Sequence, residues 1–229
     1  MAINKKQTSV WMKAVLIFVV FAFVASIIGP ALFAGLGSGP APAGSETGAV
    51  LEQIASAHAP AIASNTVALE SDPDNYDVLV NLGNSYYDWA LRIMGALQQG
   101  SGQDLPMWNA ATVYYERALA VQPGDPNVMT DMAIAYFYSG NVSRAIEVAE
   151  QVFAESPDFA PAYYNSAVFY RMAARTADAV TALERYLELE PEGTSADAAR
   201  QMLQEMEGVP SAPEPSGETT GPAGETTQP

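Results

Sequence analysis

The chain has 229 residues and no cysteine, which excludes a disulfide framework and a thiolate metal site. Its 10 basic and 26 acidic residues give a formal net charge of −16. All three lysines lie before Ala14, so the rest, with 7 arginines and 26 acids, carries −19. This charge disfavours nucleic acid and anionic lipid headgroups as partners, and it indicates either a solubilising surface or a basic partner.

The amino-terminal region predicts one membrane-spanning helix. Residues 14–28 are uncharged and strongly apolar, and the uncharged run continues to Gly44. We expect a transmembrane helix over 14–36, because a bilayer needs about 20 such residues. The positive-inside rule places residues 1–13 in the cytoplasm and the remainder outside, as in a single-pass protein of the cytoplasmic membrane. The alternative is a secretory signal cleaved after Ala41-Pro42-Ala43.

Composition separates a folded domain from its flanks. Residues 37–48 are rich in Gly, Pro and small polar residues and predict a flexible linker. Residues 209–229 have one valine and no other large apolar side chain, which predicts a disordered tail. The 160 or so residues between them, 49–208, suffice for one continuous core.

Regularly spaced prolines divide this domain into repeats. Pro123, Pro157 and Pro191 recur with a period of 34, and Pro73 precedes Pro123 by 50. Before each of the three, apolar residues recur at helical spacing in two runs separated by a short polar break. We therefore expect three helical hairpins, over about 76–123, 126–157 and 160–191, with Asn141 capping the second helix of the middle one. The fold class is all-α.

The hairpins resemble the tetratricopeptide repeat (TPR) family, in which a large apolar residue, a Leu-Gly-like pair and a Tyr precede Ala, aromatic, Ala and Pro. The first hairpin has Leu79, Leu82-Gly83, Tyr86, Ala111, Tyr115, Ala118 and Pro123. The second has Met129, Met132-Ala133, Tyr136, Ala145, Ala149, Val152 and Pro157, and the third has Tyr163, Ser166-Ala167, Tyr170, Ala179, Leu183, Tyr186 and Pro191. The resemblance covers about 75–191 and implies a TPR-type α-solenoid.

Additional helices are expected to cover both ends of the array, because a terminal hairpin would otherwise expose its apolar face. Ile62, Val67 and Leu69 predict a helix over the first hairpin. Residues 195–207, capped by Thr194 or Ser195, predict a closing helix. Its apolar residues are Ala199, Met202, Leu203 and Met206.

The first hairpin carries 16 more residues than the others, all between Tyr86 and Ala111. Apolar helical spacing continues past Tyr86 until Gly100-Ser101-Gly102, which predicts a lengthened first helix and a projecting tip. One interpretation is that the apolar residues of the tip pack against each other. The other is a partner-docking or dimer interface formed by Trp89, Ile93 and Trp108.

The sequence holds no constellation typical of an active site. The only histidine, His58, lies beside Pro60 in an alanine-rich stretch and is expected at the surface or a helix end. No nucleophile pairs with a base, and phosphate-loop, metal-ligand and calcium-loop patterns are absent. We therefore expect a protein that is not an enzyme and needs no cofactor or metal.

The resemblance implies a peptide-binding groove lined mainly by the first helix of each hairpin. We call these positions the predicted groove residues: Asp77, Val80, Asn84, Tyr87, Asp88, Asn127, Thr130, Ile134, Phe137, Tyr138, Pro161, Tyr164, Val168, Arg171 and Met172. Aromatic side chains would grip an extended or helical peptide, and Asp77 and Asp88 would pair with its basic residues. Alternatively, several of these aromatics merely cover neighbouring helices. A site that binds the terminal carboxylate of a peptide is not expected, because Arg171 is the only cationic side chain among the predicted groove residues.

Two functions are consistent with these features. The first is a membrane-anchored TPR protein that mediates protein–protein interaction on the extracytoplasmic side, in envelope assembly, secretion or chaperone-like recruitment. The second is a self-associating envelope scaffold, a homo-oligomer without a transient peptide ligand.

Overall fold

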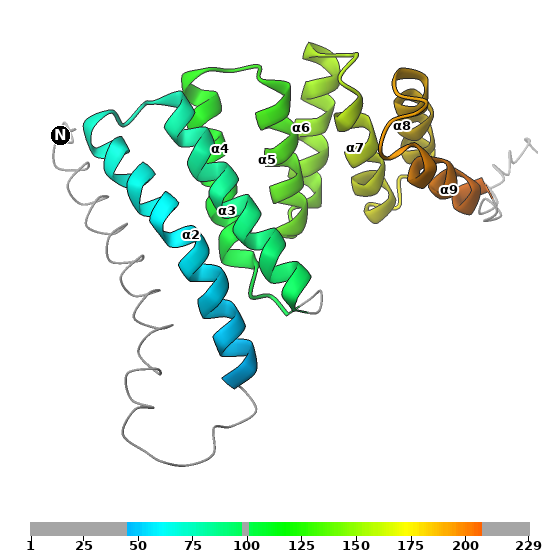
Figure 1. The fold of residues 1–229 in the computed structure, drawn as a ribbon. Helices are drawn as coiled ribbons and strands as arrows, with labels where there is room; N and C mark the ends of the chain where they lie inside the picture. The colour runs from blue at the N-terminus through cyan, green and yellow to red at the C-terminus, as the bar shows by residue number, and fades with distance from the viewer. Residues whose placement is uncertain (1–44, 98–100, 208–229) are drawn as a thin grey trace, which may run out of the picture. The chain divides into compact units, whose positions relative to one another are not determined.

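The protein is described by a computed structural model over residues 45–97 and 101–207 (Figure 1). These residues form eight α-helices and no strand, so the all-α prediction is confirmed for them. The chain divides into two compact units, Met1–Val121 and Gln122–Pro229. We call them unit 1 and unit 2.

Unit 1 contains α2 (Ser45–Ser71), α3 (Tyr76–Ala96) and α4 (Leu105–Val121). Its core is formed by Leu79 and Leu82 of α3 with Tyr114 and Ala118 of α4, and α2 packs apolar side chains against this cluster. The Asn75 side chain accepts a hydrogen bond from the backbone N–H of Val78 (3.1 Å) and so caps α3. In Figure 1, α3 lies between α2 and α4.

Helix α2 is longer than the sequence predicts. It begins at Ser45 and continues through Pro60. The prediction of a flexible linker over 37–48 is therefore wrong for residues 45–48, which are helical. Ser45 and Glu46 suit a helix start, because a carboxylate in the first turn interacts favourably with the helix dipole. Of the apolar residues expected to cover the first hairpin, two pack on the core cluster, whereas Val67 is 63% exposed.

The extra residues of the first hairpin lengthen both of its helices. Trp108, near the start of α4, is fully buried and donates a hydrogen bond from Nε1 to Asp104 Oδ2 (3.0 Å). Gly83 of α3 lies against the ring of Tyr115, and a Cβ at this position would overlap that ring. The small residue therefore allows α3 and α4 to approach closely.

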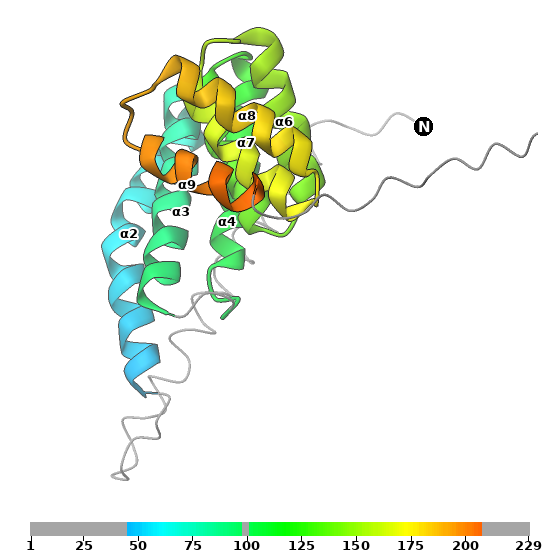
Figure 2. The same cartoon turned by 90° about the vertical axis from the view of Figure 1, so that its right-hand side faces the viewer.

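Unit 2 contains two hairpins and a further helix. The helices are α5 (Pro126–Tyr138), α6 (Val142–Glu155), α7 (Ala160–Met172), α8 (Thr176–Leu189) and α9 (Ala196–Glu207). The predicted cap at Asn141 is confirmed, because its side chain accepts a hydrogen bond from the N–H of Arg144 (3.3 Å). Helix α9 follows α8 and packs against it (Figures 1 and 2). The Ser195 carbonyl accepts the N–H of Ala199 (2.8 Å) and so begins the first turn of α9.

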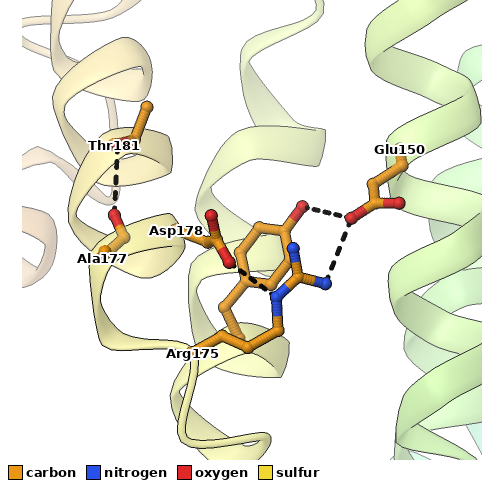
Figure 3. A network of polar contacts seen from close by, with 6 residues as sticks. Glu150, Arg175, Ala177, Asp178 and Thr181 are labelled. Atoms are coloured by element: carbon orange, nitrogen blue, oxygen red, sulfur yellow. Dashed lines mark hydrogen bonds and ion pairs between the residues drawn. The ribbon is translucent and has the colours of Figure 1, made fainter. Parts of the chain in front are cut away.

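A polar network joins α6 to the α7–α8 hairpin (Figure 3). Arg175 contacts Asp178 through Nε (2.6 Å) and Glu150 through Nη1 (3.3 Å), and its guanidinium lies 4.5 Å from the ring centre of Tyr170. The Tyr170 hydroxyl donates to the same Glu150 oxygen (3.1 Å). Burial, followed by the Glu150 carboxylate, raises the pKa of Tyr170, so this hydroxyl keeps its proton at any physiological pH.

The membrane-spanning helix predicted over 14–36 and the tail predicted over 209–229 lie outside the described residues. Within 45–97 and 101–207, no helix combines the length and the apolar character that a membrane span requires.

Candidate protein-binding surface

The predicted groove residues of unit 2 lie mainly on α5 and α7, which pack directly against each other. The ring of Phe137 on α5 stacks on that of Phe169 on α7, with ring centroids 4.9 Å apart. Helical spacing places further apolar side chains one turn apart on one side of each helix. We define the α5/α7 face as Ile134, Phe137, Tyr138, Tyr164, Val168 and Met172.

Most side chains of this face are half-buried, and one is largely exposed. Met172, in the last turn of α7, is 66% exposed, the highest value among the large hydrophobic residues described. Tyr164 leans toward Tyr186 of α8 with ring centroids 5.4 Å apart, and Phe137 lies edge-on to Tyr138 at 5.2 Å. The aromatic rings therefore cover neighbouring helices in part and keep the rest of their surface open.

The cation of the predicted groove is paired within unit 2. Arg171 Nη1 lies 3.8 Å from Glu205 Oε2 of α9, and both side chains are more than half exposed. Such a pair is worth little in free energy, but it cancels the local positive charge. A site built to hold a carboxylate would instead offer unpaired donors.

Two other predicted groove residues of unit 2 differ in exposure. Thr130 is only 6% exposed, and its Oγ1 is buried without a hydrogen-bond partner among the described residues. The prediction that Thr130 lines an open groove is therefore wrong. Asn127, by contrast, is exposed. Its backbone N–H donates a hydrogen bond to Oδ1 of Asp125, the residue that caps the start of α5 (2.9 Å).

In unit 1, the predicted groove residues divide between solvent and the α3–α4 contact. Asp77 and Asp88 are exposed. Val80 packs against the core cluster. The Asn84 side chain accepts a hydrogen bond from the Tyr115 hydroxyl (2.8 Å), and Tyr87 lies edge-on to the ring of Trp108 at 5.0 Å. Asn84 and Tyr87 thus hold α3 to α4.

The docking interface predicted at the hairpin tip is wrong for two of its three residues. Ile93 is 1% exposed and Trp108 is fully buried, so neither can contact a partner. Trp89 is half-buried and stacks on Tyr86, with ring centroids 6.2 Å apart. The alternative interpretation, that these residues pack within the protein, agrees with their burial.

His58 lies at a helix–helix contact and not at an open surface or a helix end. Its ring is parallel to that of Trp89 on α3, with ring centroids 5.9 Å apart. Tyr86 and Tyr114 extend the series of stacked rings into α4. Burial, followed by the neighbouring Tyr114, raises the pKa of Tyr86 to about 12. The helical spacing of His58 and Ile62 was the sequence signal for this position, because residues four apart share one helix face.

Residues 45–97 and 101–207 contain no group of three or more His, Cys, Asp or Glu side chains that could hold a metal ion. The expectation of a protein that is not an enzyme stays a prediction.

Comparison with known proteins supports the repeat assignment in unit 2. Residues 137–206, from the end of α5 into α9, match a family model described as tetratricopeptide repeat. TPR sequence is therefore supported over this stretch. A search of curated proteins found no match.

Solved structures of TPR domains resemble the chain at low identity. The TPR domain of Arabidopsis OM64 is 18% identical, with 57% of this chain and 94% of that chain covered and a TM-score of 0.47. The first TPR of Spaghetti (RPAP3), bound to the HSP90 peptide SRMEEVD, is 23% identical, with 59% and 96% covered and a TM-score of 0.47. The Sgt2 TPR domain from Aspergillus fumigatus is 23% identical, with 55% and 76% covered and a TM-score of 0.44.

Proposed function

We propose that this protein is a membrane-anchored interaction module that binds a segment of a partner protein on the α5/α7 face of unit 2. TPR domains are protein–protein interaction modules, and some bind peptides. The apolar residues 14–36 anchor the chain in the cytoplasmic membrane, and the repeats lie on the extracytoplasmic side. Roles in envelope assembly, secretion or chaperone-like recruitment fit this arrangement.

The observation that carries the proposal is the partly exposed apolar surface of the α5/α7 face, on which Met172 is the most exposed side chain. Met172 is 66% exposed, one helical turn after the half-buried Val168. Methionine is flexible and polarisable, and exposed methionines recur on surfaces that adapt to a partner. Half-exposed tyrosines add large contact area at little cost in side-chain entropy.

The charges of unit 2 favour a neutral or basic partner segment. Residues 122–207 contain 14 acidic residues and 5 arginines. Arg171 is already paired with Glu205, so a partner's terminal carboxylate would meet net negative charge. An extended or helical segment with apolar anchors and a lysine or arginine at its margin would be attracted electrostatically.

The alternative function, a self-associating scaffold, loses most of the dimer interface predicted at the hairpin tip, because Ile93 and Trp108 are buried. A second copy could still occupy the α5/α7 face. The crosslinking experiment described next distinguishes a second copy of this chain from a different protein.

The test places a photocrosslinking amino acid at position 172 of the full-length protein in its native membrane. The matched control is position 113, because Val113 is an apolar residue 50% exposed on α4 of unit 1. We expect an adduct with a different protein from position 172 and none from position 113. Self-adducts alone would favour the scaffold, and equal or absent adducts at both positions would contradict the proposal.

The same sample tests the anchor. Mass spectrometry of the amino-terminal peptide should find the uncleaved sequence before residue 14. A new amino terminus near Gly44 would overturn the anchor and indicate a cleaved signal.

A further inference from the structure

The chain's only histidine, His58, lies at the contact between α2 and α3. Its imidazole ring stacks on Trp89 in a parallel arrangement, with an angle of 1° between the ring planes. The Nε2 atom is buried and has no hydrogen-bond partner within the described part of the chain. A neutral imidazole tolerates this position, whereas an imidazolium would need a partner for each of its two N–H groups.

Two charged side chains of α3 act on His58. Arg92 disfavours a positive charge on the imidazole, and Asp88 favours it. Both are exposed, so solvent weakens their effects. Within α2 itself, the nearest acidic residues in the sequence are Glu52 and Glu70, six and twelve positions away. Burial has the largest effect and, together with Arg92, lowers the pKa of His58 below its usual 6.5.

Apolar side chains also hold α2 in place. Ile62 and Leu69 pack against the core cluster of α3 and α4. The rest of the helix is rich in alanine, serine and exposed side chains. Among the described helices α2 packs mainly against α3, so a loss of free energy at His58 acts on the contact that holds α2.

We propose that protonation of His58 loosens α2 from α3, so that unit 1 opens at this contact in mildly acidic surroundings. The opened form exposes the face of Trp89 on which His58 stacks at neutral pH. His58 belongs to unit 1, whereas the α5/α7 face belongs to unit 2.

The direction of the effect follows from proton linkage. In the docked form α2 lies against α3, and in the open form it has left that contact. A histidine whose pKa is lower in the docked form than in the open form binds more protons in the open form. The docked form is therefore fully favoured above pH 6.5 and loses stability as the pH falls below that value. Each pH unit between the two pKa values changes the opening constant about tenfold.

The first measurement is an NMR titration of the imidazole nitrogens in the full-length protein. Because the chain has a single histidine, the imidazole signals need no assignment. We expect His58 to titrate below pH 6.5. Titration at or above 6.5 would mean that Asp88 outweighs burial and Arg92, and it would overturn the proposal.

The second measurement is hydrogen exchange of α2 at pH 7.5 and pH 5.5, with α9 as the internal reference. His58→Phe retains an aromatic ring but cannot be protonated, and His58→Gln serves if the phenylalanine variant folds poorly. After correction for intrinsic exchange, acid should speed opening of α2 about threefold to tenfold in the native protein and leave either variant unchanged. Equal pH dependence in native protein and variants would overturn the proposal.

A matched variant separates the switch from simple weakening. Leu69→Ala removes apolar contact between α2 and the core cluster at a position about three turns away from the titrating group. Its exchange should be faster at both pH values, with the same acid response as the native protein. Loss of the acid response in Leu69→Ala would show that the response does not come from His58.

Discussion

At the scale of single residues, two glycines of α3 have opposite surroundings. A Cβ at Gly83 would overlap the Tyr115 ring, whereas a Cβ at Gly95 would meet nothing within 4 Å. Gly83→Ala should lower the free energy of unfolding by about 1–3 kcal/mol through overpacking. Gly95→Ala should raise it by about 0.5–1 kcal/mol, because alanine is the better helix former. Urea denaturation of both variants checks this, and equal shifts would contradict the close approach of α3 and α4.

Equivalent positions of the two hairpins of unit 2 hold different residues in the same unusual backbone conformation. Gly140 has φ +88°, and Ala174, at the matching place one repeat later, has φ +58°. The left-handed region costs a residue with a side chain about 1 kcal/mol relative to glycine. We expect Ala174→Gly to stabilise unit 2 by about 0.5–1 kcal/mol in thermal or urea denaturation. A destabilised variant would mean that this turn is not strained.

At the scale of elements, the second helix of two hairpins carries an arginine that donates a hydrogen bond to the carbonyl of the proline before that hairpin. We call this contact the arginine tie. Arg117 of α4 donates to the Pro73 carbonyl (2.8 Å), and Arg185 of α8 donates to that of Pro157 (3.5 Å). These arginines lie two repeat periods apart, and the position midway is Gln151 of α6. The middle hairpin therefore has glutamine where the other two have the arginine.

The repeat spacing of these arginines predicts a stabilising substitution at Gln151. Gln151→Arg should bring a guanidinium to the Pro123 carbonyl and raise the free energy of unfolding of unit 2 by about 0.5 kcal/mol, since the site is exposed. Ala154→Arg, also on α6 and exposed, adds the same charge at another position and serves as the control. Equal effects in urea denaturation would indicate a general charge effect and contradict the tie.

The sequence predicts the helices well because the proline spacing and the apolar periodicity depend on local structure. It predicts burial less well. The 16 extra residues of the first hairpin give apolar spacing around Ile93 and Trp108, but spacing alone does not say whether another helix covers that face. The start of α2 was missed because serine, glutamate and threonine suit a linker and a first helical turn alike. Thr130 was misplaced because its burial depends on packing beyond α5.

At the scale of the whole molecule, the distribution of lysines predicts the orientation in the membrane. Because the chain has no cysteine, a single introduced cysteine reports its own accessibility. With a membrane-impermeant maleimide, Val67→Cys, at a side chain 63% exposed on α2, should be labelled from the extracytoplasmic side. Gln7→Cys should react only after the membrane is opened. Reversed labelling would contradict the predicted orientation.

The most direct test of the central claim is the affinity of full-length protein for the protein crosslinked at position 172. Met172→Glu places a charge on the α5/α7 face, and Val113→Glu makes the same change on α4 of unit 1. We expect Met172→Glu to weaken binding about tenfold or more, as for a residue within a binding surface, and Val113→Glu to leave it unchanged within about twofold. Equal affinities for both variants and the native protein would contradict binding at the α5/α7 face.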